Sequence, residues 1–478
     1  MSNESRALVR GVNREQMCWR AVDVERLIGD DHAARAIWEF VGRLDLSGYY
    51  ERIEASVEEG GRPAIDPRLL ISLWVYAYSV GVGSAREVAR RCEWDPAFQW
   101  LTGCEAVNYH TLADFRVLRR AELDETFTQV LGLLSAGGLI TLDQVMQDGT
   151  KMRALASGKS FRRQRALQQH LDEVRRYVRE MGEAEPEGDS ARVRAARQRV
   201  ERERCERLEK AVAELEHLAA SNKDARVSVS DPEARRMKQP DGGFAPSYNV
   251  QFSTDAVHGA IVEVDVVQDG NDRHQLTPAL ERIEQRLGRK PQQMVADGDY
   301  TTRANIEAMQ TAGVDFIGSL RKEETAEESP FSAQQFRYDE QQNCYLCPQG
   351  KRLRPDGSQT KSGVRYRRYR IRTGECQGCP HRTACCGDHR SRNLMRPEPS
   401  AALEAFRQKM STDEAKAQYR KRSRVAEFCH AWIKSKFGLR QLPVRGLLKA
   451  KSVMLWAALT FNIQLALRLL KPQAQPAR

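Results

Sequence analysis

The sequence predicts a mixed α/β protein that has a helical N-terminal domain and two insertions. Three observations support this fold class. Strand-like and helical runs alternate between residues 138 and 320, residues 161–225 are highly charged with no strand pattern, and residues 329–399 are rich in turns and cysteine. Strands that alternate with helices indicate a sheet with crossover helices. At 478 residues, the chain is too long for one ordinary domain.

The composition excludes several classes of protein. A hydrophobic fraction of 41% is enough for a packed core, and eleven cysteines are too few for a disulfide scaffold. The start, MSNESRALVR, has no apolar run typical of a secretory signal. The most apolar stretch, residues 455–470, is 16 residues long and contains polar side chains. We therefore expect a cytoplasmic protein with reduced thiols and no membrane contact.

Basic charge is concentrated in the last third of the chain. The whole sequence has 76 Lys and Arg against 65 Asp and Glu, a net charge of +11. Residues 341–478 hold 29 of these basic and 8 of the acidic residues, which gives +21 and leaves -10 for the remainder. A basic block of this size predicts a polyanionic partner on one side of the molecule. The alternative is a basic surface without a partner.

Residues 1–137 are predicted to form the helical N-terminal domain. DPRLLISLWVYAYSVGVG is typical of a helix that begins after an Asp66 cap and ends at Gly81. A second helix opens at Ser84, with Glu87 at the spacing of a capping box. Two helices joined by a short glycine turn fit a helix-turn-helix DNA reader, or an ordinary helical hairpin. Further helices are expected around residues 111–120 and 122–135.

The remaining elements are predicted from periodicity and turn residues. A β-compatible run ends in the sequence DGT at 148–150. Residues 161–225 are predicted to form two long antiparallel helices. This pair is either a solvated insertion or an arm that contacts DNA or a second copy of the chain. SYNVQFSTD and GAIVEVDVV form a hairpin pattern, followed by a helix at 276–287 and the strand MVADGDY. Ser411 is expected to cap the last charged helix, which runs to Phe437.

Three carboxylates in this pattern are candidates for metal chemistry. Asp148 and Asp297 fall at strand ends, and Glu427 lies on the late helix. Carboxylates that meet at one sheet edge can hold two Mg²⁺ ions, which suit an in-line phosphodiester displacement. Spacing alone is a weak argument, because 65 acidic residues offer many such triplets.

The residues around these acids resemble one known family. QDGTK at 147–151, VADGDY at 295–300 and the pattern Tyr419-x2-Arg422-x4-Glu427-x6-Lys434 together resemble DDE-type bacterial insertion-sequence transposases of the branch with a Y…R…E…K signature. DPEARRMK, SYNVQ, DFR, the cysteine-rich segment and LLKAKSVMLWAALTFNIQLAL are also similar to that branch. The resemblance extends from about residue 20 to residue 472. It implies a ribonuclease-H-like fold that binds Mg²⁺ or Mn²⁺.

The resemblance also implies a catalytic set. Asp148 matches the first aspartate of the family, Asp297 the second, and Glu427 the glutamate. Asp299 competes with Asp297 for the second place, because both flank Gly298.

Four further residues are expected to contact DNA. They are Lys151, Tyr419, Arg422 and Lys434. On a helix, Glu427 and Lys434 lie about 20° apart, and Tyr419 and Arg422 fall within roughly 140° of that face. One face can then present an acid to metal ions and cations to phosphates. The alternative is a solvated charged helix.

Other polar residues near these motifs receive structural roles. Asp143, Asp265 and Glu414 are assigned to solvated surface or helix caps, and His430 and Trp432 to packing. The sequence has no phosphate-cradling P-loop, so ATP dependence is not expected.

The cysteine-rich segment predicts a structural Zn²⁺ site or a reduced thiol cluster. Cys344-x2-Cys347 and Cys376-x2-Cys379 have zinc-ribbon spacing. The resemblance instead points to the set Cys347, Cys376, Cys379 and Cys385. Between these cysteines, KSGVRYRRYRIR is either a grip for DNA backbone or a charged edge strand.

Taken as implied by the resemblance, the function is that of a DNA transposase. Such an enzyme cleaves the ends of its own insertion sequence and transfers the 3′-OH strands into target DNA by two-metal phosphodiester chemistry. Its partners are duplex DNA, both terminal inverted repeats and target, and further copies of itself in a dimer or larger assembly, at the nucleoid in a bacterial cytoplasm. The alternatives are a catalytically silent transposase-derived DNA-binding protein or repressor, and a cellular nuclease. The predicted domains are a helical N-terminal DNA-binding domain at 1–137, a ribonuclease-H-like core at 138–328 and 400–472 with a helical insertion at 161–225, and a cysteine-rich insertion at 329–399.

Overall fold

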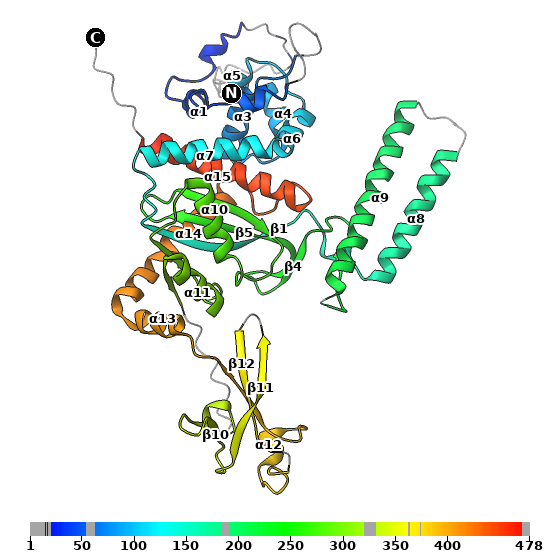
Figure 1. Ribbon diagram of the computed structural model, residues 1–478. Coiled ribbons are helices and arrows are strands. Elements are labelled where there is room, and N and C mark those ends of the chain that lie inside the picture. The colour runs from blue at the N-terminus through cyan, green and yellow to red at the C-terminus, as the bar shows by residue number, and fades with distance from the viewer. Residues whose placement is uncertain are drawn as a thin grey trace, which may run out of the picture.

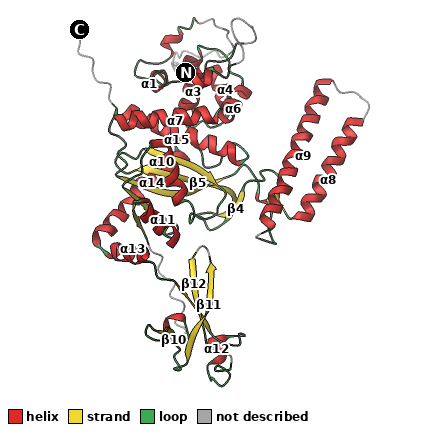
Figure 2. Cartoon of the chain, viewed as in Figure 1, coloured by secondary structure: helices red, strands yellow, loops and turns green. Residues whose placement is uncertain are grey.

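The computed structural model describes residues 15, 17, 21–53, 63–183, 191–220, 222–319, 331–361, 364–372 and 374–470. A helical domain packs against a central sheet, a two-helix arm projects to one side, and a small β lobe lies below the core (Figure 1). Helices and strands both contribute to the central part (Figure 2), which confirms the predicted mixed α/β class.

The central sheet is mixed and has β1 in its middle. Its order is β4-β5-β1-β7-β8. In addition, β6 pairs with β5 next to β4, along the edge of β5 that faces away from β1. β1 is antiparallel to β5 and parallel to β7, and β7 is parallel to β8. The strands are β1 (Gln144–Arg153), β4 (Arg235–Lys238), β5 (Phe244–Asp255), β6 (Ile261–Val267), β7 (Gln293–Ala296) and β8 (Asp315–Gly318).

Helices cover this sheet and bury its apolar side chains. Met146, Val295 and Ile317 come from three neighbouring strands and form one buried cluster with Ala415 and Ala426 of α14. That contact fixes α14 across β1, β5, β7 and β8. The helices of the core are α10 (Leu276–Leu287), α11 (Arg303–Ala312), α13 (Ala401–Ser411), α14 (Asp413–Ser435) and α15 (Leu447–Leu469).

α15 is the most apolar helix of the core. It is 23 residues long, so its length and composition would allow it to cross a membrane, contrary to the length argument made from the sequence. Within its most apolar window, however, 78% of the residues are buried inside the fold. It packs against β6, α7 and α3, and this packing accounts for its apolar character.

The N-terminal domain is built around one buried helix. Ten of the thirteen residues of α3 are buried, and the Asp66 carboxylate caps it by accepting from Arg68 N at 2.7 Å, as predicted. Ser84 makes no capping bond, so the predicted capping box does not form; Glu87 pairs with Arg90 and Arg91 instead. The elements are η1 (Val24–Leu27), α1 (Ala33–Val41), α2 (Ser47–Tyr50), α3 (Pro67–Ser79), α4 (Ala85–Trp94), α5 (Pro96–Thr102), α6 (Tyr109–Leu118) and α7 (Arg120–Ala136).

The turn between α3 and α4 docks on the end of α14. Gly81 has a φ of +79°, and a Cβ there would lie 2.9 Å from the Lys436 carbonyl oxygen. Gly438 has a φ of +70°, and a Cβ there would lie 3.1 Å from the Gly81 carbonyl oxygen. Arg116 Nη1 donates to the Gly83 carbonyl at 2.6 Å and holds the turn from the other side. The N-terminal domain therefore directly contacts the end of α14, the helix that carries Glu427.

The charged segment forms an antiparallel helical arm, as predicted (Figure 1). Leu167, Leu171 and Val174 of one helix pack against Leu208 and Leu215 of the other in a separate hydrophobic cluster. The arm consists of α8 (Gln164–Glu183) and α9 (Ala191–Ala219), with η2 (Gly158–Ser160), β2 (Phe161–Arg162) and β3 (Val227–Ser228) at its base.

The cysteine-rich segment folds as a small lobe with its own core. Its five antiparallel strands have the order β13-β12-β11-β10-β9. Leu353, Tyr369, Ile371 and Leu394 are buried between this sheet and its connections. The elements are η3 (Ala333–Gln335), β9 (Arg337–Asp339), β10 (Cys344–Leu346), β11 (Arg352–Lys361), β12 (Val364–Arg370), α12 (Arg382–Cys386) and β13 (Asn393–Pro397).

One predicted helix start is wrong. Ser411 is the last residue of α13 and its hydroxyl donates to the Gln408 carbonyl. Thr412 caps α14, because its hydroxyl accepts from Ala415 N at 3.3 Å. In the sequence STDE, Ser411 and Thr412 are both possible caps. Ser411 belongs to the preceding helix α13, which was not predicted, so Thr412 caps α14.

Candidate active site

Asp148 and Asp297 lie beside each other at one edge of the central sheet. β1 and β7 are parallel, and Gln147 pairs with Ala296 in their register. Asp148 and Asp297 are the next residues along the two strands, and neighbouring strands are about 4.8 Å apart. Two carboxylates separated by 149 positions in the chain therefore meet where β7 ends.

The Asp148 carboxylate is nearly buried under α14. Its side chain is 13% exposed, and its Oδ2 lies 3.3 Å from Arg422 Nη1 and 3.8 Å from His430 Nδ1. Burial raises the pKa of Asp148 to about 7, while the Arg422 guanidinium opposes this rise and the Asp297 carboxylate adds to it. The site thus holds a carboxylate that is protonated more readily than an ordinary aspartate, with a cation beside it.

The structure favours Asp297 over Asp299 as the partner of Asp148. Asp297 is the acidic neighbour with the largest effect on the pKa of Asp148. Its Oδ1 accepts from Asp299 N at 2.8 Å, so Asp299 belongs to the turn that leaves the strand.

Glu427 is not gathered with the two aspartates. It lies on α14, one turn before His430, and its side chain is exposed, whereas Ala426 beside it is buried against the sheet. Among the residues that the structure describes, no three Asp, Glu, His or Cys side chains stand close enough to share a metal ion. α14 presents Arg422, His430 and Lys434 to β1, and Glu427 lies at the edge of this face.

The four expected DNA contacts have different surroundings. Lys434 donates to Thr150 Oγ1 of β1, and burial lowers its pKa while Asp148 raises it. Lys151 is three positions from Asp148, so it faces the other side of β1. Tyr419 is half-buried against the sheet cluster, 5.8 Å from the Arg422 guanidinium. Arg422 and Lys434 therefore adjoin the carboxylates, and Lys151 does not.

Two residues beside the site, His430 and Asp272, were not predicted from the sequence to lie there. His430, predicted to pack, does contact Phe252, with the two tilted rings 5.1 Å apart at their centroids. It also faces Asp148, and burial lowers the pKa of His430 to about 3. Asp272, in the loop before α10, is 7% exposed and accepts from Asn249 and Gln251 of β5. A Cβ on Gly149 would lie 2.5 Å from this carboxylate, so the glycine after Asp148 makes room for it.

The two aspartates fit a divalent cation, and Glu427 does not join them among the described residues. Asp148 and Asp297 offer hard oxygen donors on adjacent strands, which is the ligand type that Mg²⁺ prefers. A bound cation would also offset the repulsion that raises the pKa of Asp148.

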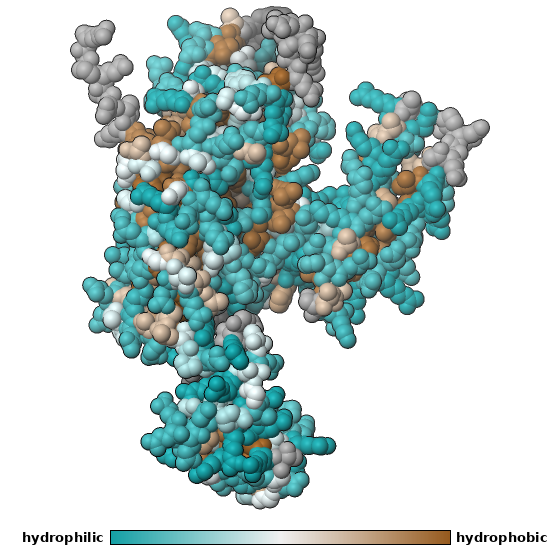
Figure 3. All heavy atoms as spheres, in the orientation of Figure 1, coloured by the Kyte–Doolittle hydropathy of each residue, from teal (hydrophilic) through white to brown (hydrophobic). Residues whose placement is uncertain are grey.

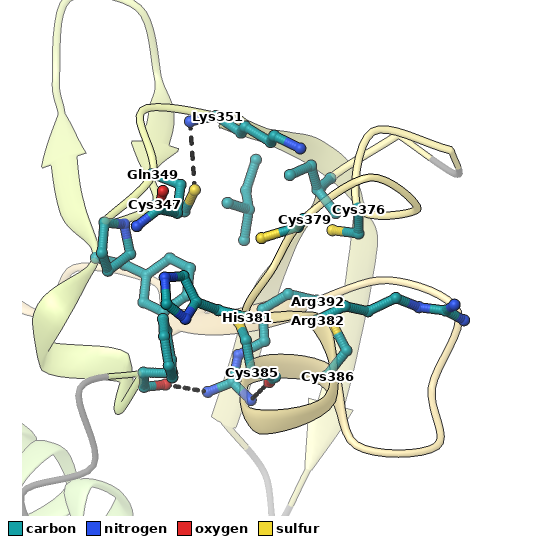
Figure 4. A pocket seen from close by; sticks show the side chains of 15 residues that line it. Cys347, Gln349, Lys351, Cys376, Cys379, His381, Arg382, Cys385, Cys386 and Arg392 are labelled. Carbon is teal, nitrogen blue, oxygen red and sulfur yellow. Dashed lines mark hydrogen bonds between the residues drawn. The ribbon is translucent and has the colours of Figure 1, made fainter.

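Cysteines of the lobe line one cavity of about 20 Å³ (Figure 4). Cys347 comes from the turn after β10, Cys376 and Cys379 from the loop after β12, and Cys385 from α12. Burial raises the pKa of Cys376 and Cys385, so these thiols are protonated. The predicted thiolate set therefore shares one cavity without reaching metal-ligand distances among the described residues.

Two family models match the chain. Residues 22–118 match a Transposase domain (DUF772), and residues 346–466 match a Transposase DDE domain. The second match includes most of the cysteine-rich lobe, Glu427 and most of α15. The two matches support a DDE-type insertion-sequence transposase. Among curated proteins, none matches it. In this transposase, α14 crosses the sheet edge where Asp148 and Asp297 meet.

Proposed function

We propose that this transposase cleaves the ends of its own insertion sequence and transfers the 3′-OH strands into target DNA. Asp148, Asp297 and Glu427 would hold two divalent ions, Mg²⁺ or Mn²⁺, on a ribonuclease-H-like sheet. The observation that carries the proposal is the pair of aspartates on adjacent parallel strands beside α14. Divalent ions, when bound there, activate the attacking oxygen and stabilise the leaving oxygen of the phosphodiester.

The residues of the chain have separate tasks in this proposal. Arg422 keeps Asp148 ionised, so that its carboxylate can ligate a cation. Lys434 is anchored to Thr150 and places a cation near the scissile phosphate. Glu427 completes the ligand set from the exposed edge of α14.

Partners and surroundings follow from this chemistry. Duplex DNA, as terminal inverted repeats and as target, would be the substrate. Two ends must be held together, so we expect a dimer or larger assembly at the nucleoid of a bacterial cytoplasm. Helices α1 to α7 would recognise the terminal repeats. In the lobe, Cys347, Cys376, Cys379 and Cys385 would hold a structural Zn²⁺ ion, since they line one cavity.

Cleavage of the DNA that flanks the gene tests this proposal. The wild type should nick the element ends in Mg²⁺ or Mn²⁺ and not in EDTA, and Asp148→Asn should lose at least ~100-fold in rate. The matched control is Asp143→Asn, since Asp143 is an exposed aspartate just before β1. Equal cleavage by wild type and Asp148→Asn would contradict the proposal.

One observation favours the alternative of a silent DNA-binding protein or repressor. Glu427 is exposed and stands apart from the aspartates. Specific binding of the element ends without metal-dependent cleavage would support that alternative. Cleavage that ignores the sequence of the ends would instead point to a nuclease.

A further inference from the structure

The outer face of the lobe sheet carries a row of arginines. Leu353 and Tyr369 point into the core of the lobe, so the residues on either side of them in β11 and β12 point outward. These residues, called here the arginine face, are Arg352, Arg354, Arg368 and Arg370. In the space-filling view the lobe surface is mostly hydrophilic (Figure 3), in line with the 14 Lys and Arg against 6 Asp and Glu in residues 329–399.

The arginine face has more positive charge than its own acid balances. Asp356 Oδ2 lies 3.4 Å from Arg368 Nε and 3.5 Å from Arg370 Nη1, so one carboxylate is shared by two guanidinium groups. Arg354 stands directly opposite Arg370 in the register of β11 and β12. Like charges directly opposite each other destabilise a strand pair. This arrangement therefore works against folding of the lobe, and a bound anion would offset it.

A second pair of opposed arginines occurs in the same sheet. Arg367 of β12 stands opposite Arg396 of β13. The Arg396 guanidinium lies over the Tyr338 ring at 3.4 Å, and its Nη1 is buried without a hydrogen-bond partner in the described residues. Two pairs of opposed arginines in a five-stranded sheet lower the stability of that sheet, and folding alone does not require them.

We propose that the arginine face binds the phosphate backbone of duplex DNA, at a site separate from the catalytic carboxylates. The inference rests on the proposed function, since it assigns part of the DNA substrate to the lobe. Arginines on neighbouring strands are about 5 Å apart and those along one strand about 7 Å apart, a spacing that flexible side chains can match to successive phosphates. The β11–β12 hairpin points from the lobe toward the core (Figure 1), and the arginine face lies at the base of this hairpin, away from its tip.

The test compares two double variants of equal charge. Arg354→Gln/Arg370→Gln removes the opposed pair of the arginine face. Arg289→Gln/Lys290→Gln removes two exposed cations before β7, at the end of that strand opposite to Asp297. Binding of the full chain to duplex DNA from the element ends is measured in EDTA over a series of salt concentrations. Circular dichroism gives the melting temperature of each protein.

The arginine variant should bind about 10-fold more weakly than wild type, with a salt slope smaller by about 2, while the control stays near wild type. Its melting temperature should equal or exceed that of wild type, because the opposed charges are gone. Affinity and slope equal to those of the control would overturn the inference, and so would a loss of affinity that accompanies a lower melting temperature. If wild type neither binds nor cleaves the duplex, the proposed function fails as well; if wild type does both, only the inference is at stake.

Discussion

Arg422 Nη1 lies 3.3 Å from Asp148 Oδ2, and both side chains are nearly buried. Helix α14 therefore places a cation beside the first of the two aspartates. Burial raises the pKa of Asp148 to about 7, and Arg422 is the strongest influence in the opposite direction. The Arg422 contact, together with a weaker effect of the hydrogen bond from Gly149 N, favours the ionised form of Asp148.

Arg422→Gln should shift the pH dependence of DNA cleavage. Loss of the guanidinium raises the pKa of Asp148 further, so the acidic limb of the activity profile moves to higher pH. We expect about a 10-fold lower rate at pH 7 for each unit of that shift, with partial recovery at pH 9. Arg420→Gln, at an exposed position of the same helix, is the control. A reduction of equal size at every pH would contradict the role given to Arg422.

Gly81→Ala should separate the N-terminal domain from α14. A methyl group at residue 81 meets both an unfavourable φ of +79° and the Lys436 carbonyl at 2.9 Å. Gly103→Ala is the matched control, because Gly103 has a φ of +64° with nothing within 4 Å of its added Cβ.

Both glycine variants should lose about 1–2 kcal/mol from the positive φ, and Gly81→Ala about 1–3 kcal/mol more from the close contact. Urea unfolding measures the difference, and DNA cleavage should fall in Gly81→Ala alone. Equal stability of the two variants would show that the α3–α4 turn does not dock as described.

The stability of the core should depend on pH through Asp231. This residue is fully buried; its Oδ1 accepts from Tyr248 Oη at 2.8 Å and from Gly446 N at 3.1 Å, and burial raises its pKa. The folded state then holds the Asp231 proton more tightly than the unfolded state. The stability that protonated Asp231 contributes is complete below the pKa of an ordinary aspartate. That stability is lost as pH rises through the raised pKa of Asp231 in the folded state.

Asp231→Asn removes that loss, since asparagine does not titrate. The free energy of unfolding of the variant relative to wild type should therefore grow as pH rises above about 4. Denaturant unfolding at several pH values measures it. A difference that stays constant with pH would mean that Asp231 is ionised with an ordinary pKa in the folded chain.

The lobe should lose bound zinc when its cysteine cavity is altered. Cys376→Ser removes a buried thiol from the cavity, whereas Cys104→Ser changes an exposed thiol of the N-terminal domain. We expect about one Zn²⁺ per chain in wild type and Cys104→Ser and much less in Cys376→Ser, by elemental analysis. Zinc-free wild type with intact folding would leave the reduced thiol cluster as the explanation.

Strand patterns together with the family resemblance predicted the pair of aspartates. Alternation in β1 and the short apolar run of β7 identify two strands, and an acid follows the apolar residues of each. Parallel strands bring such residues to one edge, so Asp148 and Asp297 could be paired before any coordinates were known. The two helices of the arm could also be predicted, since Leu167, Leu171 and Leu208 lie on their apolar stripes.

Contacts between distant segments could not be predicted in the same way. The position of His430 against Asp148 depends on how α14 rotates over the sheet, and the position of Asp272 depends on a loop that reaches behind Gly149. Helical periodicity put Glu427 and Lys434 on one face, but it does not say which residues of that face are buried. Ala426 takes the buried position, and Glu427 stays outside.

We propose that Asp148, Asp297 and Glu427 form one metal site, and this can be tested directly. Fe²⁺ takes carboxylate oxygen ligands and can therefore replace Mg²⁺ in such a site. With ascorbate and peroxide, the bound Fe²⁺ cleaves the protein backbone close to its ligands. Mass spectrometry of the fragments should show cuts close to residues 148, 297 and 427, all suppressed by excess Mg²⁺ and lost in Asp148→Asn. Cuts at the lobe cysteines only, or an unchanged pattern in Asp148→Asn, would contradict the account.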